Sequence, residues 1–154
     1  MDSDYANCPD LSQSIRGYCF TFSSGMISWA LHKQKHTADS SCYTEYIAIH
    51  DASHEVLFLH QFLDGLGMPI HDATPLFCDN DAAQQLTEDH HWHTKIKHFC
   101  VCYHSTYELV NNGELQILHV HSSENMADIL TKPSGPTDFI HLRHYLGIHS
   151  AHTA

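Results

Sequence analysis

Positive charge is scarce in this chain. Seven Lys and Arg residues stand against 18 Asp and Glu, which gives a formal net charge of −11 at pH 7. A free-standing domain that grips DNA or RNA normally carries the opposite sign, because its affinity comes from neutralising phosphates. A nucleic-acid partner is therefore excluded unless the acids have a local role and the basic surface is supplied elsewhere.

Long apolar runs and targeting signals are also missing. No stretch approaches the roughly 18 apolar residues of a membrane span, and the acidic, polar start at residues 1–4 has no signal-peptide character. The sequence thus predicts an intracellular protein of the cytoplasm or nucleus, not secreted and with no membrane partner. A chain of 154 residues can bury a core without a disulfide framework. Cys19, Cys78 and Cys100 lie in apolar runs and are expected to be buried and reduced.

Hydrophobic periodicity predicts one mixed α/β domain over residues 1–148, with a tail at 149–154. Aromatic and β-branched runs flank a small-residue turn and predict a β-hairpin. Apolar residues at three- and four-residue steps from Ala48 to Leu66 predict a long helix that ends at Gly65 and Gly67. The other expected elements are the hairpin strands at 17–22 and 26–31, strands at 75–78 and 114–121, helices at 81–86, 98–110 and 136–146, and a helix capped by Ser123 and stopped by Pro133.

Four acidic residues fall at the ends of the expected elements: Asp2, Glu45, Asp79 and Asp128. Extending the apolar stripe of the long helix backward places Glu45 on its buried face, and Asp79 ends an apolar strand. Partly buried carboxylates without Arg or Lys partners repel one another, and oxygen ligands of this kind suit Mg²⁺ or Mn²⁺. Two such ions about 4 Å apart are a device for cleaving phosphodiesters. Taken singly, each acid is also explained as a turn, cap or solvated residue, so spacing alone leaves the metal site open.

Seven short motifs follow one another along the chain. The four that hold the acids are Asp-Ser-Asp-Tyr-Ala at 2–6, Thr-Glu-Tyr-Ile-Ala at 44–48, Cys-Asp-Asn at 78–80 and Ala-Asp-Ile-Leu-Thr-Lys-Pro at 127–133. The other three are Gly-Tyr at 17–18 after Ser14, Ile-Ser-Trp at 27–29 with Lys-Gln at 33–34, and Lys-His at 97–98 with Tyr-His at 103–104. In this order and with these gaps, the chain resembles the RNase H domain at the C-terminal end of Ty1/copia-type retrotransposon polyproteins.

The resemblance implies an RNase H-like fold, a mixed sheet with helices on its faces. It also implies two-metal hydrolysis of the RNA strand of RNA–DNA hybrids, in support of reverse transcription and normally in fusion with a reverse transcriptase polymerase domain. The family's metal-binding acids carry over onto Asp2, Glu45, Asp79 and Asp128, and the cofactor would be two Mg²⁺ (or Mn²⁺) ions. One ion would activate the attacking water and the other would stabilise the departing 3′ oxygen. The fused domains would then supply the basic channel that this acidic chain lacks.

The start of the chain departs from the family pattern. The family's first acid stands on a strand that begins several residues upstream, whereas it corresponds here to Asp2. We therefore expect an RNase H-like sheet whose first strand is truncated at the N-terminus, as in a truncated reading frame or a remnant with its four acids intact. Because this strand lies in the middle of the sheet, its loss predicts poor folding, exposed strand edges and no activity for the isolated chain. Other departures, at Tyr5, Tyr43 and 100–102, would weaken substrate binding at most.

Two alternatives remain open. The chain could be a catalytically inactive remnant or interaction module that keeps the RNase H-like fold. It could also be a transition-metal protein, because His and Cys residues cluster at 90–93 and 98–104 and because His50 and His54 share a helix face. Against a zinc site, the Cys-x-Cys spacing lacks the two-residue gap of a zinc knuckle, and no His-Glu-x-x-His signature is present. Finally, His121 lies seven residues before Asp128 and is either a product-release histidine or an ordinary strand-end residue.

Overall fold

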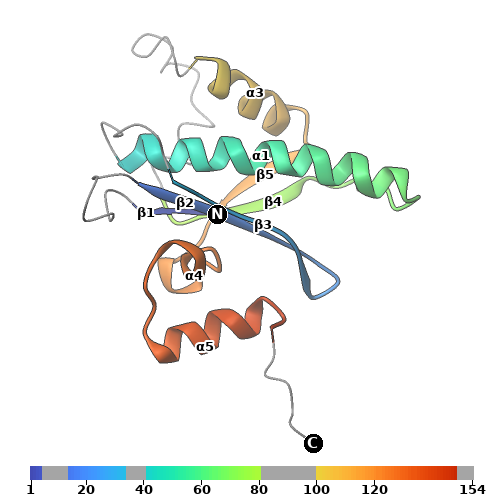
Figure 1. Cartoon of the computed structure of the whole chain (residues 1–154). Helices are drawn as coiled ribbons and strands as arrows, with labels where there is room; N and C mark the ends of the chain where they lie inside the picture. The colour runs from blue at the N-terminus through green and yellow to red at the C-terminus, as the bar shows by residue number, and fades with distance from the viewer. Residues whose placement is uncertain (5–13, 34–40, 81–99, 149–154) are drawn as a thin grey trace, which may run out of the picture.

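The computed structural model describes residues 1–4, 14–33, 41–80 and 100–148, and every structural statement below concerns these residues. Two small sheets lie side by side, with helices α1 and α3 on one face and α4 and α5 on the other (Figure 1). The predicted mixed α/β class is confirmed, and the arrangement is compatible with an RNase H-like fold. The expected helix at 81–86 and the tail at 149–154 lie outside the described residues.

The first sheet is antiparallel in the order β1-β2-β3. It contains β1 (Asp2–Asp4), β2 (Ile15–Phe22) and β3 (Gly25–Lys33). The predicted hairpin is confirmed, and its turn is Ser23-Ser24, with φ of 49° and 67°. Positive φ at both central residues is what a two-residue turn needs to match the twist of the strands.

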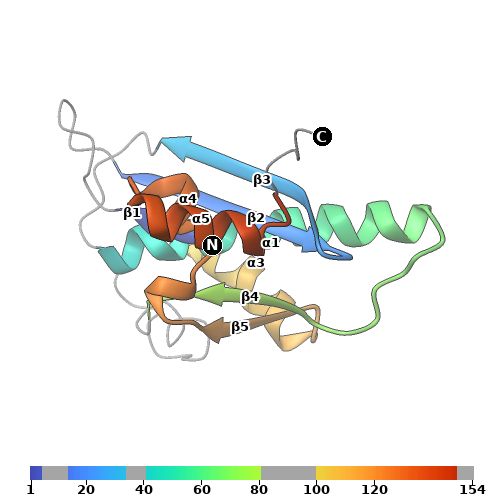
Figure 2. The same ribbon diagram turned by 90° about the horizontal axis from the view of Figure 1, so that it is seen from below.

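The second sheet pairs β4 (Thr74–Cys78) with β5 (Leu115–His119) in parallel. Parallel strands need a long crossover, and helix α3 (Cys100–Asn111) lies within it. The strands predicted at 75–78 and 114–121 and the described part of the helix predicted at 98–110 are thus confirmed. Figure 2 shows the two sheets next to each other, with β2 and β3 on one side and β4 and β5 on the other.

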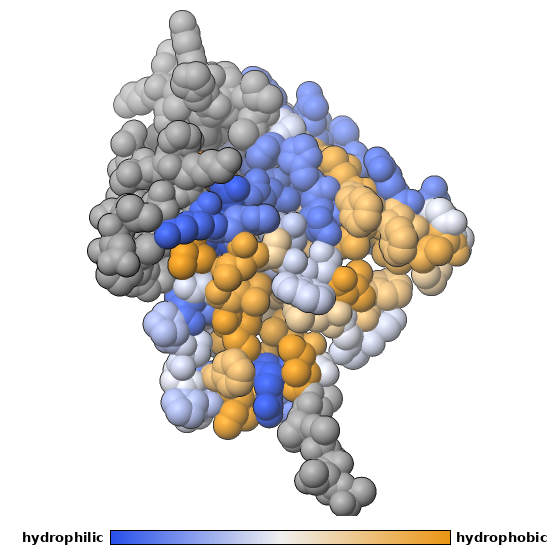
Figure 3. Space-filling model, viewed as in Figure 1, coloured by the Kyte–Doolittle hydropathy of each residue, from blue (hydrophilic) through white to orange (hydrophobic). Residues whose placement is uncertain are grey.

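Helix α1 (Ser41–Gly65) covers one face of both sheets. Its buried stripe includes Ala48, Ala52 and Val56, and it ends where the sequence predicts. One detail of the prediction is wrong: Leu66 was expected on the buried stripe, but its side chain is 57% exposed. A helix of 25 residues is about 38 Å long and runs past the ends of the short strands, so its last turns have no sheet to pack on. Figure 3 shows the resulting apolar surface at that end of the helix.

The segment after β5 is not the single Ser123-capped helix that the sequence predicts. A 3-10 turn, η2 (Ser122–Glu124), is followed by a separate short helix, α4 (Asp128–Thr131), whose N-cap residue is Ala127. Buried Asn125 separates the two, because its side chain bonds the backbone at Met1 O (3.0 Å) and at the Ala127 amide (3.2 Å). This tertiary bond across the chain outweighs the local helical pattern. The last helix, α5 (Pro136–Tyr145), agrees with the prediction.

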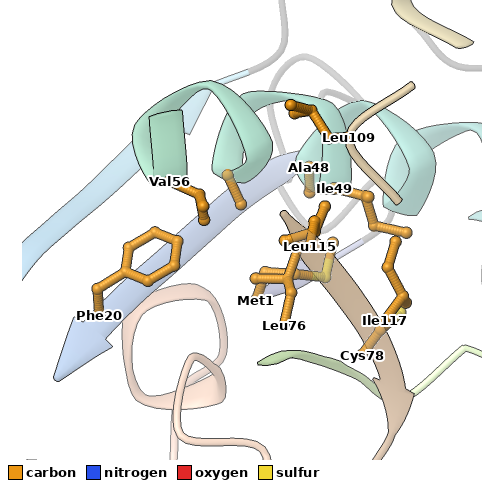
Figure 4. Packing of buried hydrophobic residues seen from close by; sticks show 11 residues of the cluster. Met1, Phe20, Ala48, Ile49, Val56, Leu76, Cys78, Leu109, Leu115 and Ile117 are labelled. Atoms are coloured by element: carbon orange, nitrogen blue, oxygen red, sulfur yellow. The ribbon is translucent and has the colours of Figure 1, made fainter. Parts of the chain in front are cut away.

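The hydrophobic core lies between α1 and the two sheets. Its members come from α1, α3 and the strands β2, β4 and β5, together with Met1 (Figure 4): Met1, Phe20, Ala48, Ile49, Ala52, Val56, Leu76, Cys78, Leu109, Leu115 and Ile117. Two of the three cysteines predicted to be buried can be assessed, and Cys78 is fully buried while Cys19 is half-buried. No helix in the described part of the chain combines the length and apolarity needed to cross a membrane.

Strand β1 connects the two sheets. It has three residues, and it pairs with β2 through Asp2 opposite Gly17. Toward the other sheet, the Met1 nitrogen donates a hydrogen bond to the Phe77 carbonyl oxygen at 2.8 Å. Because Met1 is also almost fully buried, it anchors β1 in the centre of the fold.

Candidate functional site

Three of the four predicted acids meet at one end of β4. Asp2 comes from β1, Asp79 follows the last residue of β4, and Asp128 begins α4. Each offers a carboxylate oxygen that lies within 4.8 Å of the others. Side chains distant in the sequence converge here because β1 lies beside β4 and α4 packs against β1 and β2 (Figure 1).

The fourth acid, Glu45, lies on the inner side of the first turns of α1 and is buried. Its carboxylate belongs to a second group, in which ligand atoms of Glu45, Cys78 and Asp79 lie within 4.8 Å of one another. Burial and the nearby negative charge of Glu45 raise the pKa of the Cys78 thiol to about 12. The thiol is therefore protonated at neutral pH, so the anionic ligands in this group are the two carboxylates. Asp79 is common to both groups.

The expectation that the carboxylates have no basic partner is wrong. Lys132, at the end of α4, places its Nζ 3.1 Å from Asp2 Oδ1, 3.0 Å from Asp128 Oδ2 and 3.8 Å from Asp79 Oδ2. Lys132 lies in the motif at 127–133, but the prediction from the sequence gave it no role in the site. The signal was the i,i+4 spacing from Asp128, which aligns two side chains on one helix face.

Asp2 is held by α4 as well as by its own strand. Its side chain is fully buried, and Thr131 Oγ1 donates a hydrogen bond to Oδ2 while Lys132 bonds Oδ1. Gly17 makes this contact possible: a Cβ there would lie 3.0 Å from the Thr131 methyl and 3.3 Å from Leu130 Cβ. The missing side chain thus lets α4 close against the sheet and bring its polar groups to Asp2.

Burial and like charge act together on Asp128. Desolvation and the charges of Asp2 and Asp79 raise its pKa to about 6, although Lys132 acts in the opposite direction. Burial alone would lower the pKa of Lys132, but the charges and hydrogen bonds of Asp2 and Asp128 raise it overall. Lys132 therefore stays charged at neutral pH, and the three acids keep an excess of negative charge around it.

One carboxylate oxygen of the site is suited to bind a cation. Asp128 Oδ1 is buried and has no hydrogen-bond partner within the described ranges. A buried carboxylate oxygen without a donor is unfavourable, and a hard divalent cation is the ligand that oxygen-only groups of this kind prefer. Asp79 is oriented by Ser122, whose Oγ donates to Asp79 Oδ2 at 2.8 Å. The residues present therefore fit Mg²⁺ or Mn²⁺.

The histidines expected as alternatives have other contacts. The rings of His50 and His54 lie 4.5 Å apart, and His50 Nδ1 lies 3.3 Å from Ser105 Oγ, at the packing of α1 on α3. In the residues that the structure covers, neither histidine belongs to a group of three metal-ligand atoms. His90, His91 and His93 and the side chains of Cys100 and Cys102 are outside the described part of the chain.

His121 caps the 3-10 turn. It is exposed, its Nδ1 accepts a hydrogen bond from the Ser123 amide at 3.3 Å, and it lies 2.9 Å from Ser123 Oγ. This is a local structural role, and a part in product release stays a prediction.

The chain is similar to a segment of much longer proteins. It is 36% identical over 149 residues to the retrovirus-related Pol polyprotein from transposon TNT 1-94 of Nicotiana tabacum, which covers 97% of this chain and 11% of that protein. It is 31% identical over 147 residues to the retrovirus-related Pol polyproteins from transposons RE1 and RE2 of Arabidopsis thaliana, covering 96% of this chain and 10% of each.

The chain therefore spans about a tenth of the length of these relatives. No family model matches the chain, and no solved structure matches it. The predicted resemblance to retrotransposon polyproteins is confirmed at this level, since three homologues with that name align over nearly the whole chain.

Proposed function

We propose that this segment, homologous to retrotransposon Pol polyproteins, is an RNase H domain that hydrolyses the RNA strand of RNA–DNA hybrids. Asp2, Glu45, Asp79 and Asp128 would hold two divalent cations, Mg²⁺ or Mn²⁺. One observation carries the proposal: acids from β1, α1 and α4 converge on Asp79, which follows β4 and is common to both groups of ligand atoms. When bound, such ions supply an activated water and stabilise the departing 3′ oxygen of a phosphodiester.

The protein's own residues keep this site ready for cations. Thr131 and Lys132 fix both oxygens of Asp2, and Ser122 fixes one oxygen of Asp79, so two of the carboxylates are oriented before any ion arrives. Lys132 reduces the repulsion among the acids without cancelling it, because a single ammonium faces three carboxylates. Preorganised ligands lose less conformational entropy when the ion binds.

The acidic composition limits how the substrate would be held. A net charge of −11 disfavours tight binding of a hybrid by this chain alone. Its homologues are Pol polyproteins of about ten times its length, so fusion to further domains, a polymerase domain among them, would supply the basic surface. Discrimination of RNA from DNA would depend on contacts to the 2′-hydroxyl. The setting would be the cytoplasm or nucleus.

A cleavage assay tests the proposal, on the chain joined to an upstream segment that supplies the rest of the first strand and to the domains that supply the basic surface. An RNA strand labelled at one end, annealed to DNA, should be cut only when Mg²⁺ or Mn²⁺ is present, and should give 5′-phosphate and 3′-hydroxyl ends. Asp79→Asn should abolish the cutting, whereas Asp64→Asn, at an exposed acid near the end of α1, should leave it unchanged. Cutting by Asp79→Asn at the rate of the unsubstituted chain would refute the assignment of the site.

A second function is supported by the position of Lys132. An ammonium that already bridges Asp2 and Asp128 could make the cluster a structural ion-pair network, in a domain that binds partners without chemistry. The two functions differ in their response to ions. A non-catalytic module would melt at the same temperature with and without Mg²⁺, whereas a cation site gains stability as the ion concentration rises.

A further inference from the structure

The second half of helix α1 carries an exposed apolar face. Phe58, Phe62 and Leu66 follow one another at four-residue steps, so they share one side of the helix. We call these three side chains the α1 patch. Phe58 is 56% exposed and Phe62 is 52% exposed, and apolar surface is visible at this end of the helix in Figure 3. Neighbouring exposed apolar side chains of this kind are typical of a site that binds another molecule.

One turn earlier, the β2–β3 hairpin covers the same face of α1. Glu55, three residues before Phe58, accepts hydrogen bonds from Ser28 Oγ of β3 at 2.5 Å and from the Tyr18 hydroxyl of β2 at 3.4 Å. Beyond this contact, the hairpin bends away from α1 toward its turn (Figure 1). Within the described residues, the helix face therefore continues past the end of the sheet surface that covers it.

The two phenylalanines of the α1 patch form one aromatic surface. Their ring centroids lie 6.0 Å apart and the ring planes differ by 19°, so the rings are stacked. Side chains that already hold each other in place lose less conformational entropy when a partner binds. The faces of aromatic rings also attract Lys and Arg side chains.

The surroundings of the α1 patch are acidic. Residues 41–80 contain no Lys or Arg and six acids: Glu45, Asp51, Glu55, Asp64, Asp72 and Asp79. The last turn of α1 has no basic residue and holds exposed Asp64. The C-terminal end of a helix carries partial negative charge of its own, which a nearby cation stabilises. A partner with positive charge beside its apolar contacts would therefore complement this end of the helix.

These charges disfavour two other occupants. A second copy of the chain would bring the same acidic segment and a net charge of −11 to the interface, so the two copies would repel each other. An anionic membrane surface would be repelled for the same reason. A helix is a suitable partner because apolar rows on two helices can interdigitate.

We propose that the α1 patch is the docking site of an amphipathic helix that carries Lys or Arg beside its apolar stripe. From Phe58 to Leu66 the patch is about 12 Å long at about 1.5 Å per residue, so about three turns of the partner helix cover it. The partner's cations lie near Asp64 and the end of α1. The helix belongs to another domain of the polyprotein, since the homologues are Pol polyproteins of which the chain spans about a tenth. The inference does not depend on nuclease activity.

Two peptide probes test the inference by fluorescence anisotropy. The first is a labelled 14-residue amphipathic helix of Leu and Lys, and its control has Glu at every Lys position. The Lys peptide should bind the full chain with a Kd of about 10–100 µM. The Glu peptide should bind at least about tenfold more weakly. The chain joined to the domains that supply the basic surface should also bind the Lys peptide at least about tenfold more weakly, because its own helix occupies the patch.

Three variants locate the binding. Phe62→Ser should weaken binding of the Lys peptide at least about tenfold, and its melting temperature should not fall, because the ring is half exposed. Asp64→Lys should weaken binding of the Lys peptide and strengthen binding of the Glu peptide. Ile140→Ser, at an equally exposed apolar residue of α5, is the control and should change neither.

Several results would overturn the inference. The chemistry of the partner is wrong if the Lys peptide does not bind or if both peptides bind equally. The location is wrong if Phe62→Ser binds the Lys peptide as well as the unsubstituted chain does. Undiminished binding by the joined chain would exclude a helix of the polyprotein. A dimer in gel filtration, or binding to phosphatidylserine vesicles, that Phe62→Ser abolishes would identify a second copy or a membrane as the occupant.

Discussion

The gap between β2 and β4 has two ends that are built in different ways. At the closed end, β1 lies in the gap and its Asp2 is fully buried among polar partners from α4. At the open end, apolar residues of β2, β4 and α5 surround a cavity. Hydrogen bonds and ion pairs between side chains hold the closed end together, whereas mostly apolar residues surround the open end. The comparison shows that the acidic cluster depends on α4, which brings Asp128, Thr131 and Lys132 to Asp2 and Asp79.

The largest expected effect is the loss of chemistry at the closed end. Asp79→Asn removes one ligand charge from both groups of acids, so Mg²⁺-dependent cleavage of hybrid should fall at least about 100-fold, since each tenfold loss is roughly 1.4 kcal/mol of transition-state stabilisation. Stability should be unchanged or higher, because like-charge repulsion is relieved. Initial rates on labelled hybrid and thermal melting of the same samples measure both. A variant that is inactive only because it is unfolded would lose its melting transition.

Lys132→Met should lower the stability of the fold at the closed end, and bound cations should restore part of that stability. Without the ammonium, buried Asp2 loses its charged partner, and we expect a loss of about 1–3 kcal/mol in the free energy of unfolding, below the range for deeply buried pairs because Lys132 is 34% exposed. Added Mg²⁺ should then raise the melting temperature more in this variant than in the unsubstituted chain. Lys33→Met, at an exposed lysine at the end of β3, is the control and should show neither effect. An equal rise in melting temperature with Mg²⁺ in all three chains would contradict a site at which Lys132 and the cation bind the same carboxylates.

The raised pKa of Asp128 predicts a pH-dependent effect of Asp128→Asn. Because the folded-state pKa of about 6 lies above the ordinary value of 3.8, ionisation of Asp128 destabilises the fold. This penalty is nearly absent below pH 4, develops as the pH rises from about 4 to 6, and is complete above that range. Asp128→Asn should therefore gain about 1–2 kcal/mol relative to the unsubstituted chain at pH 8 and nothing at pH 4, in the absence of divalent ions. Urea unfolding across this pH range measures the difference, and a gain that is largest at pH 4 would contradict the assigned direction.

The smallest effect concerns His121, beside the closed end. Removing the cap with His121→Ala should cost about 0.5–1 kcal/mol, whereas His121→Asn keeps a capping acceptor and should cost less. If His121 also assists product release, both variants should lower turnover while hybrid binding survives. Equal turnover in all three chains would leave capping as its role.

The sequence was most informative about regular elements and least informative about contacts between them. Alternation and three- to four-residue periodicity placed the hairpin, α1, β4, β5 and α5 because these patterns depend on local geometry. The split between η2 and α4 was missed because it depends on Asn125 bonding Met1, 124 positions away in the chain.

The same limit applies to the site. The four acids were named from motifs and element ends, but Lys132 was missed. Its position among the carboxylates depends on α4 closing over Gly17, which no local pattern reveals. The cavity beyond β1 could likewise not be predicted from hydrophobic periodicity, because strands from two different sheets line it.

Titration of Mn²⁺ into the chain by calorimetry tests the central claim, that Asp2, Glu45, Asp79 and Asp128 form a site for two cations. We expect two ions per chain, tighter binding in Lys132→Met because the competing ammonium is gone, and loss of both ions in Asp79→Asn because both groups share that carboxylate. No detectable binding by the folded, unsubstituted chain, or the same number of bound ions in Asp79→Asn, would contradict the account.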